Sequence, residues 1–358
     1  MPSKDKLLAK LELPYQPHDA TKYRPPIGLI GCGGITRNHL KAYRAAGYDV
    51  VALCDIDHQR VLARQEEFYP QAKIYSDWQD LIRRDDIDVV DIATHPAIRT
   101  PIIEAAVTSG KHVLSQKPFV LDLDQDERLV ELADKHNVRL AVNQNGRWAP
   151  HFSYINQAIR AGILGSIEAV HMSVHWDHTW VQGTEFEKIN HLILYDYAIH
   201  WFDILNCFFD DRETIRVYAS VAKARSQKVS PPLLGQVLLE YADAQASLAF
   251  DANLRFGSQD RTFISGSLGS IRSEGPGNKI QQLTVSTESS TVQPKLEGCW
   301  FPDGFRGTMG ELLLSVEENR EPSICAANNL KSLALCFAAV ASAERHTPVV
   351  PGTVRKMP

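Results

Sequence analysis

The chain of 358 residues is long for a single hydrophobic core, so its length predicts two domains, and a content of 44% apolar and 23% charged residues is typical of globular proteins. A formal net charge of −5, without a long basic or acidic run, argues against nucleic acid or an anionic membrane as a partner. The six scattered cysteines form no Cys-x-x-Cys pair and no apolar stretch suits a signal core or a membrane span, so we expect a cytoplasmic protein.

The first 25 residues are polar and lead into consecutive prolines, which favours an extended arm. Short apolar runs then alternate with helical patterns, and these runs occupy residues 27–30, 50–53, 89–93, 112–114 and 139–142. Strands that alternate with helices predict parallel βαβ units with helices on both faces. We therefore expect residues 26–148 to form a doubly wound, mostly parallel α/β domain of the Rossmann type.

The pattern changes after residue 150. A helical segment is followed by a strand at 166–176, a helix near 193–208 and several short alternating runs between residues 215 and 253. Amphipathic segments at 310–318 and 327–343 predict closing helices. Residues 149–358 are thus expected to form an α+β domain with a large, open, mostly antiparallel sheet.

A glycine-rich turn follows the first apolar run. Gly31 would make the tight bend, Gly33 and Gly34 would let the backbone approach a pyrophosphate, and the helix that starts near Ile35 would direct its amino end at the phosphates. A purely structural turn is the alternative. The position of this turn, between a predicted strand and a predicted helix, favours dinucleotide binding.

Asp55 ends the second apolar run, at about the 20-residue spacing expected for the acidic residue that binds the adenosine ribose. Its negative charge would repel a 2′-phosphate, which favours NAD over NADP. Arg60 lies one helical turn further and could weaken this preference.

Two other segments carry candidate catalytic groups. Lys117 precedes a proline at the end of the run that starts at residue 112, at the sheet edge where ligands bind in open α/β folds, although most lysines are only solvated surface groups. Asp196 and His200 are four residues apart, so on a helix the carboxylate could orient the imidazole and raise its basicity. A surface acid and a core histidine are the alternative.

The run at residues 171–178 alternates, so His171, Ser173, His175 and Asp177 would share one face of a strand. If that face looks toward the cofactor, His175 and Asp177 could bind a carbohydrate; a solvent-facing strand is the alternative. The histidine and acid spacing matches no closed zinc pattern, and we expect no metal.

Taken together, the glycine turn at 31–35, the segment from residue 110 to Gln116-Lys117-Pro118, and Asp196 with His200 resemble the Gfo/Idh/MocA family of oxidoreductases, in order and in spacing. The resemblance covers nearly the whole chain from residue 27. It implies a Rossmann domain, a second domain with a large open sheet, and hydride transfer between NAD(P) and a hydroxyl carbon of a sugar, cyclitol or related carbohydrate.

The resemblance also implies roles for individual residues. Lys117 matches the lysine that reaches the reacting oxygen and the nicotinamide ribose, and Asp196 and His200 match the helix pair at the substrate. Thr94, Gln116 and Arg147 are expected to contact the cofactor. The base could be His200 or Lys117, and the sequence does not decide between them.

Two positions depart from the family pattern. Gln116 replaces the usual glutamate before the lysine, which removes a negative charge there. Arg99 stands where the family commonly has histidine, and His95-Pro96 replaces a Pro-Asn turn, so the loop beside the nicotinamide is expected to differ.

Two other functions compete with a dehydrogenase. An NAD-dependent glycosidase would oxidise, eliminate and re-reduce its substrate, so the cofactor would be recycled. A catalytically silent NAD-sensing regulator would not need Lys117, Asp196 and His200 together. The sheet of the second domain is expected to mediate a homodimer or homotetramer, because a broad sheet face left uncovered would expose apolar surface to water.

Overall fold

The computed structural model describes residues 11–210 and 212–358. They divide into two compact units. The Rossmann unit contains residues 17–148 and 301–333, and the sheet unit contains residues 11–16, 149–300 and 334–358. One division between the units falls after residue 148. Residues 17–25, expected in an arm, and residues 301–333, expected in the second domain, group with the Rossmann unit.

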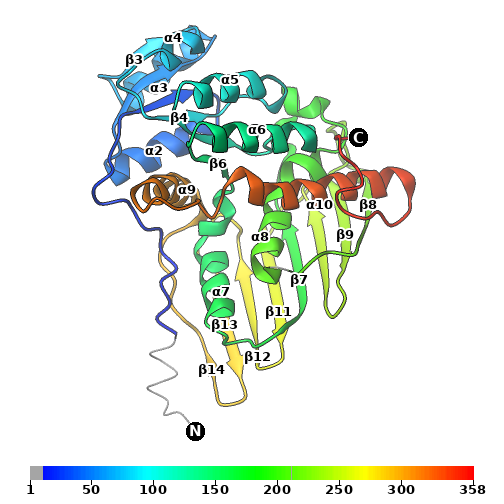
Figure 1. The fold of residues 1–358 in the computed structure, drawn as a ribbon. Helices are drawn as coiled ribbons and strands as arrows, with labels where there is room; N and C mark the ends of the chain where they lie inside the picture. Colours follow the sequence, from blue (N-terminus) through cyan, green and yellow to red (C-terminus); the bar gives the residue numbers. More distant parts are fainter. Residues whose placement is uncertain (1–10, 211) are drawn as a thin grey trace. The chain divides into compact units, whose positions relative to one another are not determined.

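The Rossmann unit contains a six-stranded parallel sheet in the order β3-β2-β1-β4-β5-β6 (Figure 1), which confirms the expected fold class. Its strands are β1 (Ile27–Ile30), β2 (Val50–Cys54), β3 (Lys73–Tyr75), β4 (Val89–Ile92), β5 (His112–Gln116) and β6 (Leu140–Asn143). Its helices are α2 (Thr36–Ala46), α3 (His58–Phe68), α4 (Trp78–Ile82), α5 (Pro96–Thr108) and α6 (Leu123–Lys135). The strand order reverses between β1 and β4, and ligands bind at such a switch point.

Helix α9 (Trp300–Glu317) explains why residues 301–333 join this unit. Its buried side chains Phe305, Met309 and Leu312 belong to the same apolar cluster as Leu40 and Tyr43 of α2. The Glu317 carboxylate also accepts hydrogen bonds from the backbone N–H groups of residues 22 and 23, at 2.6 and 2.8 Å. Residues 17–25 are held by contacts of this kind.

The sheet unit contains eight strands in the order β14-β13-β12-β11-β7-β10-β9-β8, antiparallel except between β7 and β10. They are β7 (Ile167–His175), β8 (Arg216–Ala222), β9 (Leu234–Glu240), β10 (Gln245–Asp251), β11 (Gln259–Gly266), β12 (Gly269–Gly275), β13 (Gln282–Thr287) and β14 (Thr291–Val292). The helices are α7 (Pro150–Arg160), α8 (Ile199–Phe209) and α10 (Ala326–Arg345), of which α10 contributes its residues from 334 onward.

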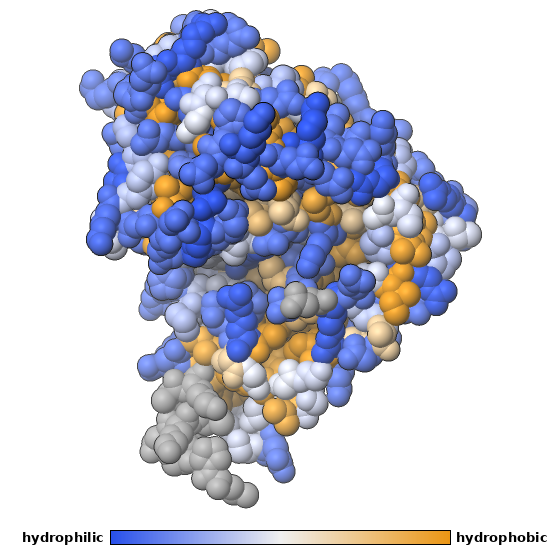
Figure 2. Space-filling model, viewed as in Figure 1, coloured by the Kyte–Doolittle hydropathy of each residue, from blue (hydrophilic) through white to orange (hydrophobic). Residues whose placement is uncertain are grey.

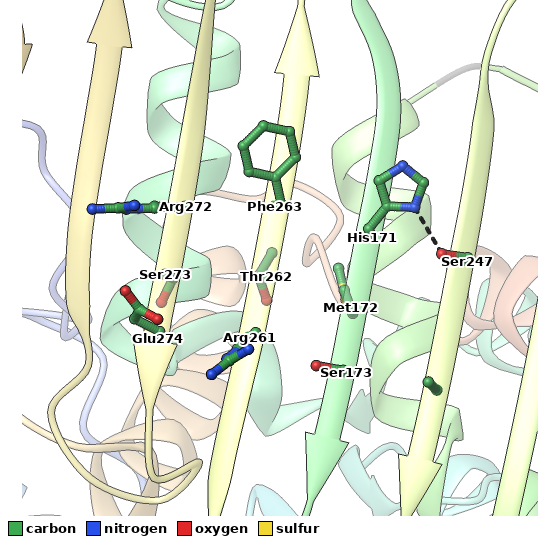
Figure 3. A pocket seen from close by; sticks show the side chains of 11 residues that line it. His171, Met172, Ser173, Ser247, Arg261, Thr262, Phe263, Arg272, Ser273 and Glu274 are labelled. Atoms are coloured by element: carbon green, nitrogen blue, oxygen red, sulfur yellow. Dashed lines mark hydrogen bonds between the residues drawn. The ribbon is translucent and has the colours of Figure 1, made fainter.

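The two faces of this sheet differ in burial. On β7, Val170, Met172 and Val174 are at most 3% exposed, whereas His171 between them is exposed. Figure 3 looks onto the exposed face, and helices lie behind the strands. Alternation along β7 is therefore as the sequence predicted, with one face covered and the other bare.

The surface over α5 and α6 is mostly hydrophilic in the space-filling view (Figure 2). Across the described residues, no helix combines the length and apolar character that a membrane span requires.

Candidate functional site

The glycine turn between β1 and α2 has two different kinds of glycine. Gly31 has φ +97°, and a Cβ there would lie 2.8 Å from the Ala93 carbonyl oxygen, so only glycine fits without strain. A Cβ on Gly33 or Gly34 would meet no atom within 4 Å. This open side, at the amino end of α2, fits a pyrophosphate group next to backbone N–H donors. Ile35 immediately precedes α2, as expected.

Asp55 is fixed next to this turn by two backbone hydrogen bonds. Its Oδ2 accepts from the Cys32 N–H at 2.6 Å, and its Oδ1 accepts from the Asp57 N–H at 2.9 Å. The carboxylate is half-buried, at the carboxyl end of β2. Each carboxylate oxygen can accept a second hydrogen bond, so Asp55 keeps the capacity to bind a ribose hydroxyl.

The nearby arginines make contacts that the sequence did not reveal. Arg60 forms an ion pair with Asp57, with Nε 3.1 Å from Oδ2. Arg64 donates from Nη2 to the Gly33 carbonyl at 3.2 Å, so it supports the glycine turn from α3. Arg60 is thus engaged with the residue that caps α3, rather than with the Asp55 carboxylate.

Thr94 and Lys117 follow neighbouring parallel strands. β4 pairs with β5 up to Ile92 and Ser115, and Thr94, Gln116 and Lys117 lie at the carboxyl ends of these strands. The Gln116 side-chain oxygen accepts from the Lys117 backbone N–H at 3.0 Å, and the bond between Lys117 and Pro118 is cis. Thr94, Gln116 and Lys117 therefore lie at the sheet edge where open α/β folds bind their ligands, and their contact with a cofactor stays a prediction.

Arg147 lies in the 3-10 turn Asn145–Trp148 that follows β6. Its Nη1 donates to the Ser323 carbonyl at 2.7 Å, within the Rossmann unit. The expected role of Arg147 at the cofactor stays a prediction.

Asp196 and His200 lie in the sheet unit, but not on the single helix that the sequence predicted. Residues Ile193–Tyr197 form a π-helical turn, in which the Ala198 N–H donates to the Ile193 carbonyl at 3.0 Å, and α8 starts at residue 199. Asp196 is 8% exposed. π turns are rare and are frequently found at functional sites.

Aromatic side chains hold the start of α8. The His200 ring is edge-on to Trp300 and Trp201, with ring centroids 5.3 and 6.1 Å apart, and Trp201 also contacts Tyr197 at 5.0 Å. Such rings bury a large area at low entropic cost. The packing restricts the orientation of the His200 ring.

The buried carboxyl group of Asp260 is connected to this aromatic cluster through Trp176. Trp176 packs edge-on against Trp300, at a centroid distance of 5.6 Å, and its Nε1 donates to Oδ1 of Asp260 at 2.6 Å. Burial raises the pKa of Asp260 to about 7, although the hydrogen bond from Trp176 opposes the increase. No local pattern marks Asp260 in the sequence, because its hydrogen-bond partner Trp176 lies 84 positions away.

His175, expected to bind substrate, is the last residue of β7, and Asp177, expected to do the same, lies just after it. His175 shares the bare sheet face with His171 and Ser173, whereas Phe250 on the opposite face packs against Tyr197 at the start of the α8 region. Asp177 is exposed, and the N–H and hydroxyl of Thr179 donate to its Oδ1 at 2.9 and 2.6 Å, which holds its pKa below the usual value. The expected role of both residues at the substrate stays a prediction.

The Rossmann and sheet units each match a known sequence family. Residues 26–144 match the oxidoreductase family with an NAD-binding Rossmann fold, and residues 152–272 match the GFO/IDH/MocA C-terminal domain. The chain belongs to the GFO/IDH/MocA family. It is thus an oxidoreductase with an NAD-binding Rossmann domain, which confirms the resemblance seen in the sequence.

The individual relatives share less than a third of their aligned residues with this chain. A D-apiose dehydrogenase from Paraburkholderia graminis is 28% identical over 334 residues, which cover 88% of this chain and 86% of the relative. An inositol 2-dehydrogenase from Salmonella typhimurium is 28% identical over 195 residues, 53% of this chain and 56% of the relative. The crystal structure of an oxidoreductase from Agrobacterium radiobacter in complex with NAD+, L-tartaric acid and magnesium has a TM-score of 0.83 and 22% identity, and the match covers 91% of this chain and 98% of that one. The last similarity establishes the fold.

Proposed function

We propose that this protein is an NAD-dependent dehydrogenase that transfers a hydride between the nicotinamide and a hydroxyl carbon of a sugar, cyclitol or related carbohydrate. The observation that carries the proposal is the position of Lys117 at the carboxyl end of β5, on the edge that contains the glycine turn. The family to which the chain belongs, and the relatives named as dehydrogenases of D-apiose and inositol, support the substrate class.

The residues at the glycine turn fit a dinucleotide. Gly33 and Gly34 leave room for the pyrophosphate, Asp55 presents carboxylate oxygens to the adenosine ribose, and Thr94 and Gln116 lie where the nicotinamide half would extend. When bound, NAD accepts or donates the hydride, which no side chain of this protein can do. The negative charge of Asp55 favours NAD over NADP, since a 2′-phosphate there would be repelled.

Three side chains are assigned to the proton and the substrate oxygen. His200 takes the hydroxyl proton, because an imidazole titrates near neutral pH. Asp196 orients His200 and stabilises its imidazolium form, and Lys117 donates a hydrogen bond to the oxygen as negative charge develops there. Lys117 and His200 could exchange the role of base.

The first experiment is a screen of sugars, cyclitols and glycosides with NAD+, followed by the absorbance of NADH. Lys117→Met and His200→Ala should each lower turnover by about two to four orders of magnitude, the range of general acid–base catalysis, while NADH still binds. Lys135→Met, which removes an ammonium from the end of α6, is the matched control and should keep full activity. Full turnover in both site variants would remove the proposed site.

The same screen separates the two competing functions. A glycosidase with recycled NAD would release its leaving group without a stoichiometric change in NADH absorbance. A silent NAD sensor would bind NADH but turn over no substrate in the screen.

We also propose that the bare sheet face is the interface of a homodimer or homotetramer. Its centre has the small side chains of Ser173, Ser247 and Ala249 beside His171. Larger apolar side chains on other strands are also exposed: Phe263 45%, Leu238 56% and Tyr218 40%. Arg261 lies opposite Glu274 on the neighbouring strand, so the face carries charges of both signs. Figure 3 shows Arg261, Phe263 and Glu274 among the residues that line a cavity of about 370 Å³ on this face. A face of this kind is self-complementary in charge and can pack against a second copy.

A further inference from the structure

Arg99 is a buried cation next to Thr94 and Gln116, the two residues predicted to contact the nicotinamide half of the cofactor. It lies on α5, is 1% exposed, and is one of the largest fully buried side chains among the described residues. Burial of a charge is costly unless it is well compensated by hydrogen bonds. A guanidinium at this place therefore requires an explanation from its contacts.

Those contacts are backbone carbonyls from two separate loops. Arg99 Nη1 donates to the carbonyl oxygens of Gln116 and Pro118, and lies 3.3 Å from that of Phe119. Its Nη2 donates to the carbonyl oxygen of Thr94. The first set belongs to the last residue of β5 and the loop that follows it, and the last belongs to the loop after β4.

The residue between two of these carbonyls is Lys117. Gln116 and Pro118 are its immediate neighbours in the chain, so one guanidinium nitrogen fixes the backbone on both sides of the lysine. The other guanidinium nitrogen ties this segment to Thr94. The stem of the Lys117 side chain therefore starts from a backbone whose position depends on Arg99.

We infer that Arg99 is a positioning residue, which clamps the loops after β4 and β5 together and thereby sets the position of Lys117. The inference rests on the proposed function only in giving Lys117 a catalytic role.

Other side chains cannot reproduce this arrangement. A lysine has one ammonium centre, so it could contact one loop well but not both with a fixed geometry. Methionine has a similar length but no donor, and it would leave the Thr94 and Gln116 carbonyls without this partner. Lys117 would then move, and a displacement of about 1 Å of a catalytic group can cost on the order of 100-fold in rate.

The test compares full-length Arg99→Met, Arg99→Lys and wild type by two measurements. Backbone hydrogen exchange is followed by mass spectrometry for segments 93–96 and 116–121, with β1 as the internal reference. Steady-state kinetics use the substrate found in the screen. Arg128→Met is the matched control, because Arg128 is an exposed arginine of α6 that pairs with Glu104 of α5.

The inference predicts faster exchange in both loop segments of Arg99→Met, unchanged exchange in β1, and a kcat lower by about 100-fold. KM should change little, because Lys117 acts mainly on charge that develops in the transition state. Arg99→Lys should recover part of both effects, and Arg128→Met should resemble wild type. If Arg99→Met does not fold, Arg99→Lys alone must show intermediate exchange and a lower kcat.

Two results would overturn the inference. One is exchange of both loops at the wild-type rate in the Arg99 variants, whatever happens to kcat. The other is a wild-type kcat despite loosened loops. If the screen finds no substrate, the proposed function fails but the exchange data still decide whether Arg99 clamps the two loops.

Discussion

Asparagine in place of Asp126 is predicted to change how the stability of the Rossmann unit depends on pH. Asp126 lies on the buried face of α6, with an exposure of 0%, and neither carboxylate oxygen has a hydrogen-bond partner among the described residues. Burial raises its pKa from 3.8 to about 8, with a smaller contribution from the charge of Glu127. The folded protein therefore keeps a proton that the unfolded chain releases.

The sign and size of the effect follow from this difference. Between about pH 4 and pH 8 the folded state binds more protons than the unfolded state, so the free energy of unfolding falls as the pH rises. The stabilising contribution is complete below the unfolded pKa of 3.8 and is lost by about pH 8. One pKa unit corresponds to about 1.4 kcal/mol, so the loss from pH 5 to pH 7 is on the order of 2 to 3 kcal/mol.

The assay is urea unfolding of wild type and Asp126→Asn at pH 5 and pH 7. Asparagine has the same shape but cannot ionise, so the difference between the two proteins isolates this carboxyl group while the other titrating groups cancel. The variant should gain about 2 kcal/mol over wild type on going from pH 5 to pH 7. Glu131→Gln, an exposed acid of the same helix, is the control and should gain nothing. Parallel pH dependences in wild type and Asp126→Asn would refute the reasoning.

Three further predictions concern the cofactor and the assembly. Gly31→Ala should weaken NADH binding by at least about tenfold in a fluorescence titration, because the added Cβ conflicts with Ala93 and the backbone strain is about 1–3 kcal/mol. Gly47→Ala is the control: it carries a similar backbone strain but lies away from the glycine turn, so NADH binding should not change. Asp55→Ala should raise the ratio of kcat/KM for NADP to that for NAD, because a repelling charge is removed; an unchanged ratio would place the ribose elsewhere. Phe263→Glu should reduce the sedimentation coefficient at micromolar protein, and a monomeric wild type would contradict the proposed interface.

The Rossmann strands were predictable because each is a short apolar run bounded by turn residues. β1 and β4 are buried along their whole length, and this burial is what a continuous apolar run encodes. The glycine turn was also local, since Gly31 and the start of α2 are only a few residues apart. In contrast, α9 joins this unit through side chains some 270 positions from their partners on α2, and no local pattern contains that information.

The candidate site was predictable where a motif carries the chemistry and not where distant contacts decide it. Lys117 lies at the expected sheet edge, whereas Asp196 and His200, expected on one helix, are divided between the π turn and α8. The alternation around His175 was correctly recognised, but which face is covered depends on helices elsewhere in the chain. Arg99 was noted only as an unusual residue, because its carbonyl partners have no side-chain signature.

The π turn before α8 contains one more residue than an α-helical turn would need. Successive side chains of an α-helix are about 100° apart around the helix axis. Deletion of one residue in this turn would therefore rotate every later side chain of α8 by about 100° around the axis of α8. His200 would then face another way although the sequence of α8 itself was intact. Chimeras made between this enzyme and its relatives must therefore preserve the length of this segment, even where they exchange its composition.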